Sequence, residues 1–245
     1  MINIILNGAL GRMGKEVEKL IGNSDEFSLA ARIDKLSEDN SCFKDINDFD
    51  GSADIIIDFS FHGCTPALLD YAEKRELPIV IATTGHTQEE LERIKSAGEK
   101  IPVFHSANMS LGVALLVDLA KKAAEVMPDA DIEIVETHHN RKLDAPSGTA
   151  LIIANALKKV RKNANILTGR SGSGKREKDE IGISSVRMGN IVGIHEVLVS
   201  TDNQTITLKH EAHSRALFAE GALSAASFLI GKKAGVYDMN SIVSQ

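Results

Sequence analysis

The sequence has few aromatic residues and no excess of basic charge. Of its 245 residues, 4% are aromatic and none is tryptophan, while Asp and Glu outnumber Lys and Arg by 34 to 28. Proteins that bind nucleic acid usually present a basic face, and single-strand binders add aromatic side chains on which bases stack. This composition argues against nucleic acid as a partner.

Cysteine and long apolar runs are also scarce. The two cysteines, Cys42 and Cys64, show no repeated spacing, and a chain that is 43% hydrophobic can bury a full core without a disulfide. The apolar segment 2–6 has no basic leader and ends at Asn7 and Gly8, so we expect neither a signal peptide nor a membrane span. The sequence therefore predicts a cytoplasmic protein of two domains with no membrane partner.

The first half of the chain has the pattern of a dinucleotide-binding domain. A strand-length apolar run precedes Gly8, Gly11 and Gly14, and a helical pattern follows. A glycine-rich turn between strand and helix lets the backbone approach a pyrophosphate, which binds at the helix N-terminus. The spacing G-x-x-G-x-x-G differs from the commoner G-x-G-x-x-G, so this motif alone leaves a packing role open.

An acidic residue follows the second predicted strand, residues 27–33. Asp34 lies 20 positions beyond Gly14, where a carboxylate accepts hydrogen bonds from an adenosine ribose. Lys35 is next to it, and a basic residue there can pair with the 2′-phosphate of NADP. The pair leaves NADH and NADPH both open, and a turn-capping role for Asp34 is the alternative.

Strands and helices are expected to alternate as far as residue 106. The predicted strands are 53–60, 78–82 and 102–106, and the predicted helices are 65–75 and 88–96, the second opened by a capping box of Thr87 and Glu90. Nearly continuous apolar runs are typical of parallel strands covered on both faces. We therefore expect βαβ order throughout and an α/β fold with a Rossmann-like parallel sheet. The nicotinamide would lie where these strands end.

The second half predicts an α+β domain built on a mixed or antiparallel sheet. A long helix is expected over 111–127, an alternating strand over 131–138, and further strands over 181–187, 194–200 and 204–212. A buried helix over 214–230 is expected to return to the first domain. We therefore place a dinucleotide-binding domain at 1–108 plus about 213–245, and a substrate-binding and oligomerisation domain at 109–212.

The segment 136–150 holds the densest set of proton-transfer and anion-binding groups. His138, His139, Arg141 and Lys142 lie within five positions, in a chain whose net charge is −6. This local contrast suggests an anionic small-molecule ligand. A helix predicted to open at Ser147 offers free backbone N–H groups to a carboxylate or phosphate. Beside a nicotinamide these groups indicate a reduction whose proton comes from His138 or Lys142.

Other interpretations of these segments are weaker. The histidine pair could bind a metal, but neighbouring side chains on a strand diverge and no cysteine or carboxylate lies at ligand spacing, so we predict no metal site. A structural role for the cluster would not call for so many charges. Residues 169–175 nearly match the phosphate-binding G-x-x-x-x-G-K-[ST] loop, but Arg176 takes the hydroxyl position. We interpret this segment as a mobile, solvated loop.

The chain resembles the dihydrodipicolinate reductase family along nearly its whole length. The resemblance rests on residues 8–14, 58–60, 82–85, 106–110, 136–150, 180–182 and 187–195. It implies NADH- or NADPH-dependent reduction of a cyclic dicarboxylate, 4-hydroxy-tetrahydrodipicolinate, to tetrahydrodipicolinate with loss of water, in lysine and diaminopimelate biosynthesis. Family members are usually homotetramers formed through the sheet of the second domain.

The resemblance also implies roles for individual residues. His138 would be the proton donor and acceptor, Lys142 the proton donor, and His139, Gly148 and Thr149 would hold the substrate. The cofactor would contact Gly8, Ala9, Leu10, Gly11, Arg12, Met13, Asp34, Ala82, Thr83, Thr84, Ser106, Ala107, Asn108 and Met109. Ala82 replaces the family's commoner glycine and Met109 its commoner phenylalanine. Neither change touches the proton chemistry, but both could alter how the nicotinamide is bordered.

Two other functions fit parts of the pattern. Another amino-acid-pathway dehydrogenase of similar architecture, such as an aspartate dehydrogenase, would act without a dicarboxylate ring. A nicotinamide-binding regulatory protein would keep the first domain but have no turnover. The set of His138, Lys142, Gly148 and Thr149 argues against the regulatory protein, because a sensor needs no proton donor.

Overall fold

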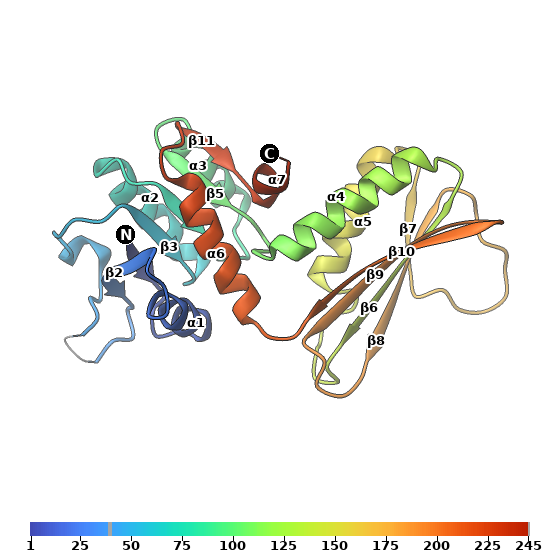
Figure 1. The fold of residues 1–245 in the computed structure, drawn as a ribbon, viewed down its shortest axis with the longest axis horizontal. Coiled ribbons are helices and arrows are strands. Elements are labelled where there is room, and N and C mark those ends of the chain that lie inside the picture. Colours follow the sequence, from blue (N-terminus) through green and yellow to red (C-terminus); the bar gives the residue numbers. More distant parts are fainter. Residues whose placement is uncertain (39–40, 245) are drawn as a thin grey trace. The chain divides into compact units, whose positions relative to one another are not determined.

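The computed structural model describes residues 1–38 and 41–244, in two compact units. One unit consists of Met1–Ser110 and Ala216–Gln245, and the other of Leu111–Arg215. Each unit is built on its own sheet (Figure 1). Among the described residues, no helix has both the length and the apolar character needed to cross a bilayer.

The first unit contains a six-stranded parallel sheet in the order β11-β5-β4-β3-β1-β2. Its strands are β1 (Ile2–Asn7), β2 (Phe27–Ile33), β3 (Ile55–Asp58), β4 (Ile79–Ile81), β5 (Pro102–His105) and β11 (Gly235–Tyr237). After β2 the chain crosses to the other side of β1 to form β3. This reversal creates the crevice at the carboxyl ends of β1 and β3 where open α/β sheets bind ligands.

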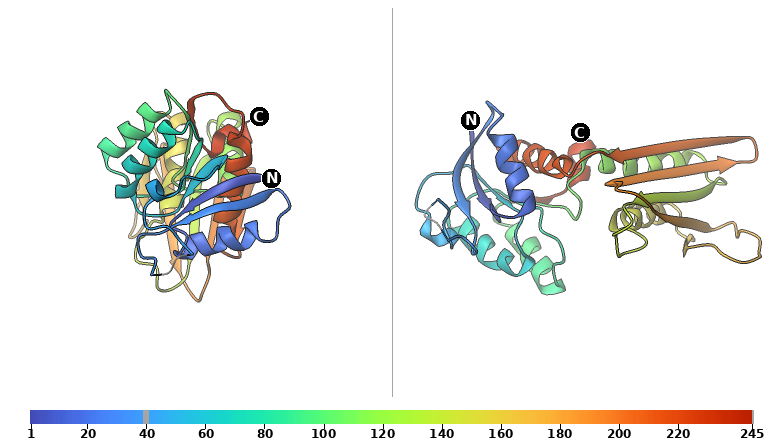
Figure 2. Two further views of the ribbon diagram at one scale, coloured as in Figure 1. Left: turned by 90° about the vertical axis from the view of Figure 1, so that its left-hand side faces the viewer. Right: turned by 90° about the horizontal axis from the view of Figure 1, so that it is seen from below.

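Helices cover both faces of this sheet (Figure 2). On one face lie α1 (Arg12–Ile21) and α6 (Ala216–Leu229), and on the other α2 (Thr65–Lys74) and α3 (Gln88–Ala97); the short α7 (Met239–Val243) follows β11. The central strands are apolar because both of their faces are buried, and β3 has three fully buried isoleucines at 55–57.

The expectation of βαβ order throughout is wrong between β2 and β3. The described part of that connection has a short 3-10 helix, η1 (Ile46–Asp48), in place of an α-helix. The Asp45 carboxylate caps it by accepting a hydrogen bond from the Asn47 N–H. The segment is rich in Asp and Asn, which bond to their own backbone and so favour turns over helix interiors.

The second unit contains a five-stranded mixed sheet in the order β10-β9-β6-β8-β7. Its strands are β6 (Asp131–His138), β7 (Asn165–Thr168), β8 (Glu180–Arg187), β9 (Gly193–Thr201) and β10 (Gln204–Ala212). Helices α4 (Leu111–Val126) and α5 (Gly148–Val160) lie side by side against one face (Figure 1). They bury a core that includes Ile132, Ile134 and Ile153.

The loop between β7 and β8 is only partly the solvated loop that the sequence indicates. Residues 169–175 are exposed, in agreement with that interpretation. Arg176, however, is half-buried and pairs with Asp131 and Glu133. This arginine anchors the loop to β6, because its planar guanidinium group has several N–H donors and can bind both carboxylates.

Candidate active site

The turn after β1 has a conformation and packing that require glycine. Gly8 has φ +78°, and a Cβ there would stand 2.5 Å from the carbonyl oxygen of Phe59. A Cβ at Gly14 would stand 2.2 Å from the Gly8 oxygen, so α1 packs directly on the turn. Gly11, at the N-cap of α1, is exposed and makes no side-chain cap. An open, uncapped helix start of this kind suits a pyrophosphate.

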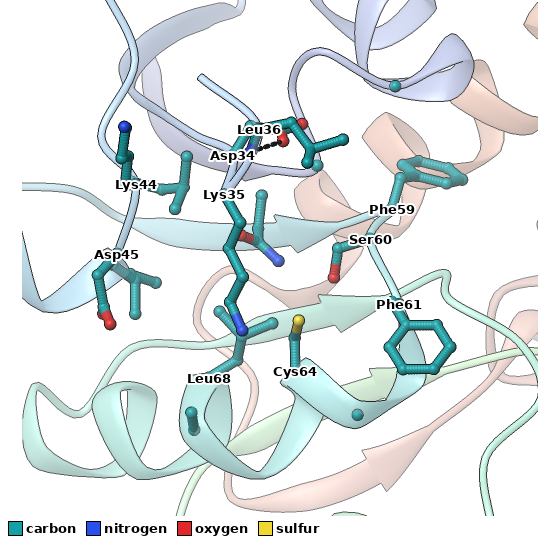
Figure 3. Close-up of a pocket in the computed structure, with 17 residues that line it drawn as sticks. Asp34, Lys35, Leu36, Lys44, Asp45, Phe59, Ser60, Phe61, Cys64 and Leu68 are labelled. Carbon is teal, nitrogen blue, oxygen red and sulfur yellow. Dashed lines mark hydrogen bonds between the residues drawn. The ribbon is translucent and has the colours of Figure 1, made fainter. Parts of the chain in front are cut away.

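The carboxylate of Asp34 ties two turns together beside this helix start. Its Oδ2 accepts the Leu10 N–H at 3.0 Å. Its Oδ1 accepts the Leu36 N–H at 2.9 Å (Figure 3). A pocket of about 350 Å³ opens there, and Figure 3 shows Lys35 extending across it toward Cys64. The lining residues include Gly8, Gly11, Asp34, Lys35, Lys44, Ser60, Phe61, Cys64 and Leu68.

The pocket brings together three of the predicted cofactor residues, Gly8, Gly11 and Asp34, and adds others that the sequence analysis missed. Lys44 is a second cation in the lining, but it lies in a segment without a periodic pattern. Phe61 is 62% exposed, and an exposed aromatic ring beside a pocket is recognisable only in the structure.

Four other predicted cofactor residues lie in the turn after β1 and in the first turn of α1: Ala9, Leu10, Arg12 and Met13. The last seven, residues 82–84 and 106–109, follow the ends of β4 and β5, which are adjacent because Ile81 pairs with His105. Thr84 and Ala107 are exposed at this edge, whereas Thr83 and Met109 are buried. The Thr83 hydroxyl donates to Oδ2 of the buried Asp58 at 2.7 Å. Thr83 and Met109 therefore shape the edge, and we expect their backbone, not their side chains, to face a ligand.

A buried carboxylate and a histidine lie next to each other at the end of β6. Side chains two positions apart on a strand point to the same face, so Glu136 and His138 both lie on the helix-covered side of the sheet. Glu136 is fully buried, and its Oε2 is 2.5 Å from His138 Nδ1. Arg187, from β8, donates from Nη1 to Oε2 at 2.8 Å and from Nη2 to Oε1 at 2.7 Å.

This arrangement fixes the charges at the end of β6. Burial opposes ionisation of Glu136, but side-chain hydrogen bonds from Arg187, Ser185 and His138 lower the pKa of Glu136 to about 2. Burial lowers the pKa of His138 below its ordinary value, although Glu136 acts in the opposite direction. The neutral form of the ring is therefore favoured more strongly than in an exposed histidine.

A second buried histidine packs against the first. His195, from β9, lies with its ring centroid 5.2 Å from that of His138, and its Nε2 is 3.0 Å from the Ser147 hydroxyl. Burial, and then the neighbouring His138, lower the pKa of His195 to about 4. His195 is thus neutral at physiological pH.

The loop from β6 to α5 carries the predicted substrate residues. Lys142 Nζ is 2.7 Å from Asp144 Oδ1. The Nδ1 atom of His139 is buried and has no hydrogen-bond partner among the described residues. The Ser147 hydroxyl caps α5 by accepting the Ala150 N–H at 3.2 Å. Gly148 is exposed, and apart from its chain neighbours and the backbone of its own helix nothing lies within 4 Å of the position a Cβ would take. The start of α5 is therefore open to an anion.

Glu136, Arg187 and His195 belong to the site although the sequence did not predict a role for them. Period-two alternation along residues 131–138 could have placed Glu136 on the same face as His138. No comparable local signal exists for Arg187 and His195, because they reach the site through the register of β8 and β9 beside β6.

Known proteins resemble this chain over its full length. The model of "Dihydrodipicolinate reductase, N-terminus" matches residues 2–109, and that of "Dihydrodipicolinate reductase, C-terminus" matches residues 112–243. A 4-hydroxy-tetrahydrodipicolinate reductase from Caldanaerobacter subterraneus subsp. tengcongensis is 46% identical, over 100% of this chain and 99% of the relative. A solved structure of a dipicolinate-bound dihydrodipicolinate reductase from Paenisporosarcina sp. TG-14 has a TM-score of 0.86 and 25% identity, over 99% of each chain. An aspartate dehydrogenase from Thermotoga maritima, at TM-score 0.52 and 14% identity, shares the fold alone; the two chains are covered to 95% and 98%.

Proposed function

The chain belongs to the dihydrodipicolinate reductase family, and from this membership we propose how its residues divide the work of the reaction. It is an NADH- or NADPH-dependent 4-hydroxy-tetrahydrodipicolinate reductase, which forms tetrahydrodipicolinate in lysine and diaminopimelate biosynthesis. The bound dinucleotide supplies a hydride. Because a hydride enters and water leaves, each turnover also consumes one proton, which the protein must deliver.

His138 is the group that gives and takes this proton. The observation that supports this role is its buried contact with Glu136, which holds one ring nitrogen and leaves the other for the substrate. Lys142 is the second proton donor, and its ion pair with Asp144 keeps the ammonium group close to the loop before substrate arrives. A positioned acid of this kind typically contributes about 10²–10⁴-fold to a rate.

The substrate dicarboxylate is held by His139, Gly148 and Thr149. Gly148 lies open at the start of α5, where backbone N–H groups and the helix dipole favour a carboxylate. The solved structure of the Paenisporosarcina relative contains bound dipicolinate, a planar ring with two carboxylates. The experiment that tests the function follows NADH oxidation with substrate made in place by a dihydrodipicolinate synthase.

The glycine turn and Asp34 hold the dinucleotide, together with the residues after β4 and β5. Gly8, Ala9, Leu10, Gly11, Arg12 and Met13 surround the open start of α1, where the pyrophosphate binds. Ala82, Thr83, Thr84, Ser106, Ala107, Asn108 and Met109 border the nicotinamide at the adjacent strand ends. Lys35 and Lys44 line the same pocket as Asp34, so the pocket can accommodate a ribose hydroxyl or a 2′-phosphate.

Asp34→Ala is expected to raise KM for NADH more than KM for NADPH. The carboxylate accepts hydrogen bonds from the ribose of NADH, whereas Lys35 can retain the 2′-phosphate of NADPH. The variant also loses the bonds to Leu10 and Leu36, which loosens the turn for both cofactors. The ratio of the two KM values cancels that shared loss, so steady-state kinetics with each cofactor isolate the ribose contact. Equal effects on both would show that Asp34 does not contact the ribose.

We further propose a cytoplasmic homotetramer that assembles through the second sheet. The face opposite α4 and α5 carries half-buried or exposed side chains such as Val135, Leu198 and Thr207, and two such faces can bury one another. Both cysteines, Cys42 and Cys64, are free thiols, which suits a reducing compartment. Light scattering after gel filtration should give four times the 26.4 kDa subunit mass. A monomer mass at micromolar concentration would exclude this assembly.

A further inference from the structure

We propose that Glu136 positions His138 for proton transfer, by fixing the neutral-ring proton on Nδ1 and turning Nε2 toward the substrate. We also propose that Arg187 keeps Glu136 ionised and limits how strongly it retains the His138 proton. Neither residue contacts the substrate in this scheme, so both act through His138. The inference rests on the proposed role of His138 and extends it to the residues behind the ring.

The hydrogen bonds around Glu136 determine the tautomer of His138. Oε2 accepts from Arg187 Nη1 and lies 2.5 Å from His138 Nδ1. Oε1 accepts from Arg187 Nη2 and from the Ser147 N–H, the latter at 3.1 Å. The arginine and the backbone amide can only donate, so this fully buried carboxylate is held in its ionised, accepting form. His138 Nδ1 must therefore carry the hydrogen, and the lone pair of the neutral ring is on Nε2.

Space is left on the Nε2 side of the ring by Gly193 in β9. A Cβ at Gly193 would stand 3.1 Å from His138 Nε2 and 3.5 Å from its Cδ2. Any other residue would press against the edge of the ring that exchanges the proton. The glycine thus keeps the reactive nitrogen uncovered by β9, while Glu136 holds the opposite nitrogen.

Four charged or titratable groups face His138. Arg187 and Lys142 are cationic and disfavour its protonation, and Glu136 favours it. His195 adds no charge, because burial and the neighbouring His138 lower the pKa of His195 to about 4. The imidazolium formed on His138 is therefore stabilised by one carboxylate that it shares with Arg187. An unshared carboxylate would hold the proton more tightly and slow its release.

Arg187 also connects this pair to the loop that carries Lys142. Its Nη2 donates to the carbonyl oxygen of Asp144 at 2.7 Å, and the Asp144 carboxylate pairs with Lys142. Arg187 thereby connects both proposed proton donors, His138 and Lys142, through one hydrogen-bond network.

The tautomer can be measured in the wild-type protein without any substitution in the network. Nitrogen-15 NMR of ring-labelled histidine distinguishes a protonated ring nitrogen from one that carries a lone pair, and loss of one signal set in His138→Gln assigns the residue. At a pH above the His138 pKa, we expect Nδ1 protonated and Nε2 with the lone pair. The reverse tautomer would overturn the proposal.

Two substitutions should shift the pH profile of kcat/KM in opposite directions. In Glu136→Gln the side chain keeps one acceptor oxygen in place of two, so it no longer fixes the orientation and tautomer of His138. We expect kcat to fall by about 10²–10⁴-fold, as when the aspartate of a catalytic triad is replaced by its amide. Proton donation needs the protonated ring, so activity declines as pH rises through the His138 pKa. Loss of the carboxylate moves this decline to lower pH, whereas Arg187→Met leaves the carboxylate to His138 alone and moves it to higher pH.

Glu133→Gln is the matched control, since Glu133 lies on the same strand and is also paired with an arginine, Arg176. We expect it to keep kcat and the pH profile of the wild type. Thermal unfolding and dipicolinate binding show that each variant is folded. If Glu136→Gln and Glu133→Gln lower Tm alike and neither moves the pH profile, Glu136 is structural and the proposal is wrong. An active His138→Ala would instead refute the assigned role of His138.

Discussion

Replacing His138 by alanine is expected to lower kcat by roughly 10²–10⁴-fold, with a modest change in KM for the dicarboxylate. The ring supplies a proton in the transition state, whereas the substrate carboxylates are held by other groups. Steady-state kinetics with saturating NADH measure the effect. His213→Ala, on an exposed position of the same unit, is the control and should keep the wild-type kcat. An unchanged kcat in His138→Ala would remove this residue from the mechanism.

Lys142→Met is expected to lower kcat/KM by roughly 10²–10³-fold, and to raise KM as well as lower kcat. The ammonium group donates a proton and also attracts a carboxylate, so its loss weakens the ground state and the transition state together. Methionine keeps most of the length of the side chain, which limits the packing change. Lys122→Met, on the exposed face of α4, is the matched control.

The two variants are distinguished by dipicolinate binding, measured by calorimetry. Lys142→Met should bind dipicolinate more weakly, whereas His138→Ala should bind it nearly as well as the wild type. If Lys142→Met binds dipicolinate and turns over substrate like the wild type, Lys142 neither donates the proton nor contacts the carboxylate. Its ion pair with Asp144 would then only stabilise the loop between β6 and α5.

Local sequence features predicted much of the fold. The turn at Gly8 was recognisable because a strand, a glycine-rich segment and a helix follow one another. The start of α5 was recognisable from Ser147, which does cap that helix. The capping box of Thr87 and Glu90 is present as predicted. The resemblance to the dihydrodipicolinate reductase family, which rests largely on residues 136–150, is confirmed by the matching family models.

The parts that the sequence did not predict depend on contacts between distant segments. Arg187 lies beside His138 because the two residues are register partners in the pairing of β6 with β8. His195 lies beside Glu136 for the same reason in the pairing of β6 with β9. No periodicity within one strand encodes the register between two strands. The short strands β7 and β11 were missed for the same reason, because each lies at an edge of its sheet and is defined by a single pairing. Lys44 joins the cofactor pocket through a connection that has no regular pattern.

The central claim is that this chain reduces 4-hydroxy-tetrahydrodipicolinate through the site at the end of β6. The most direct measurement follows NADH and NADPH oxidation by absorbance, with substrate made in place by a dihydrodipicolinate synthase from pyruvate and aspartate semialdehyde. We predict rapid oxidation that requires the synthase and that His138→Ala reduces to a small fraction. Binding of NADH without any synthase-dependent oxidation in the wild-type protein would contradict the account.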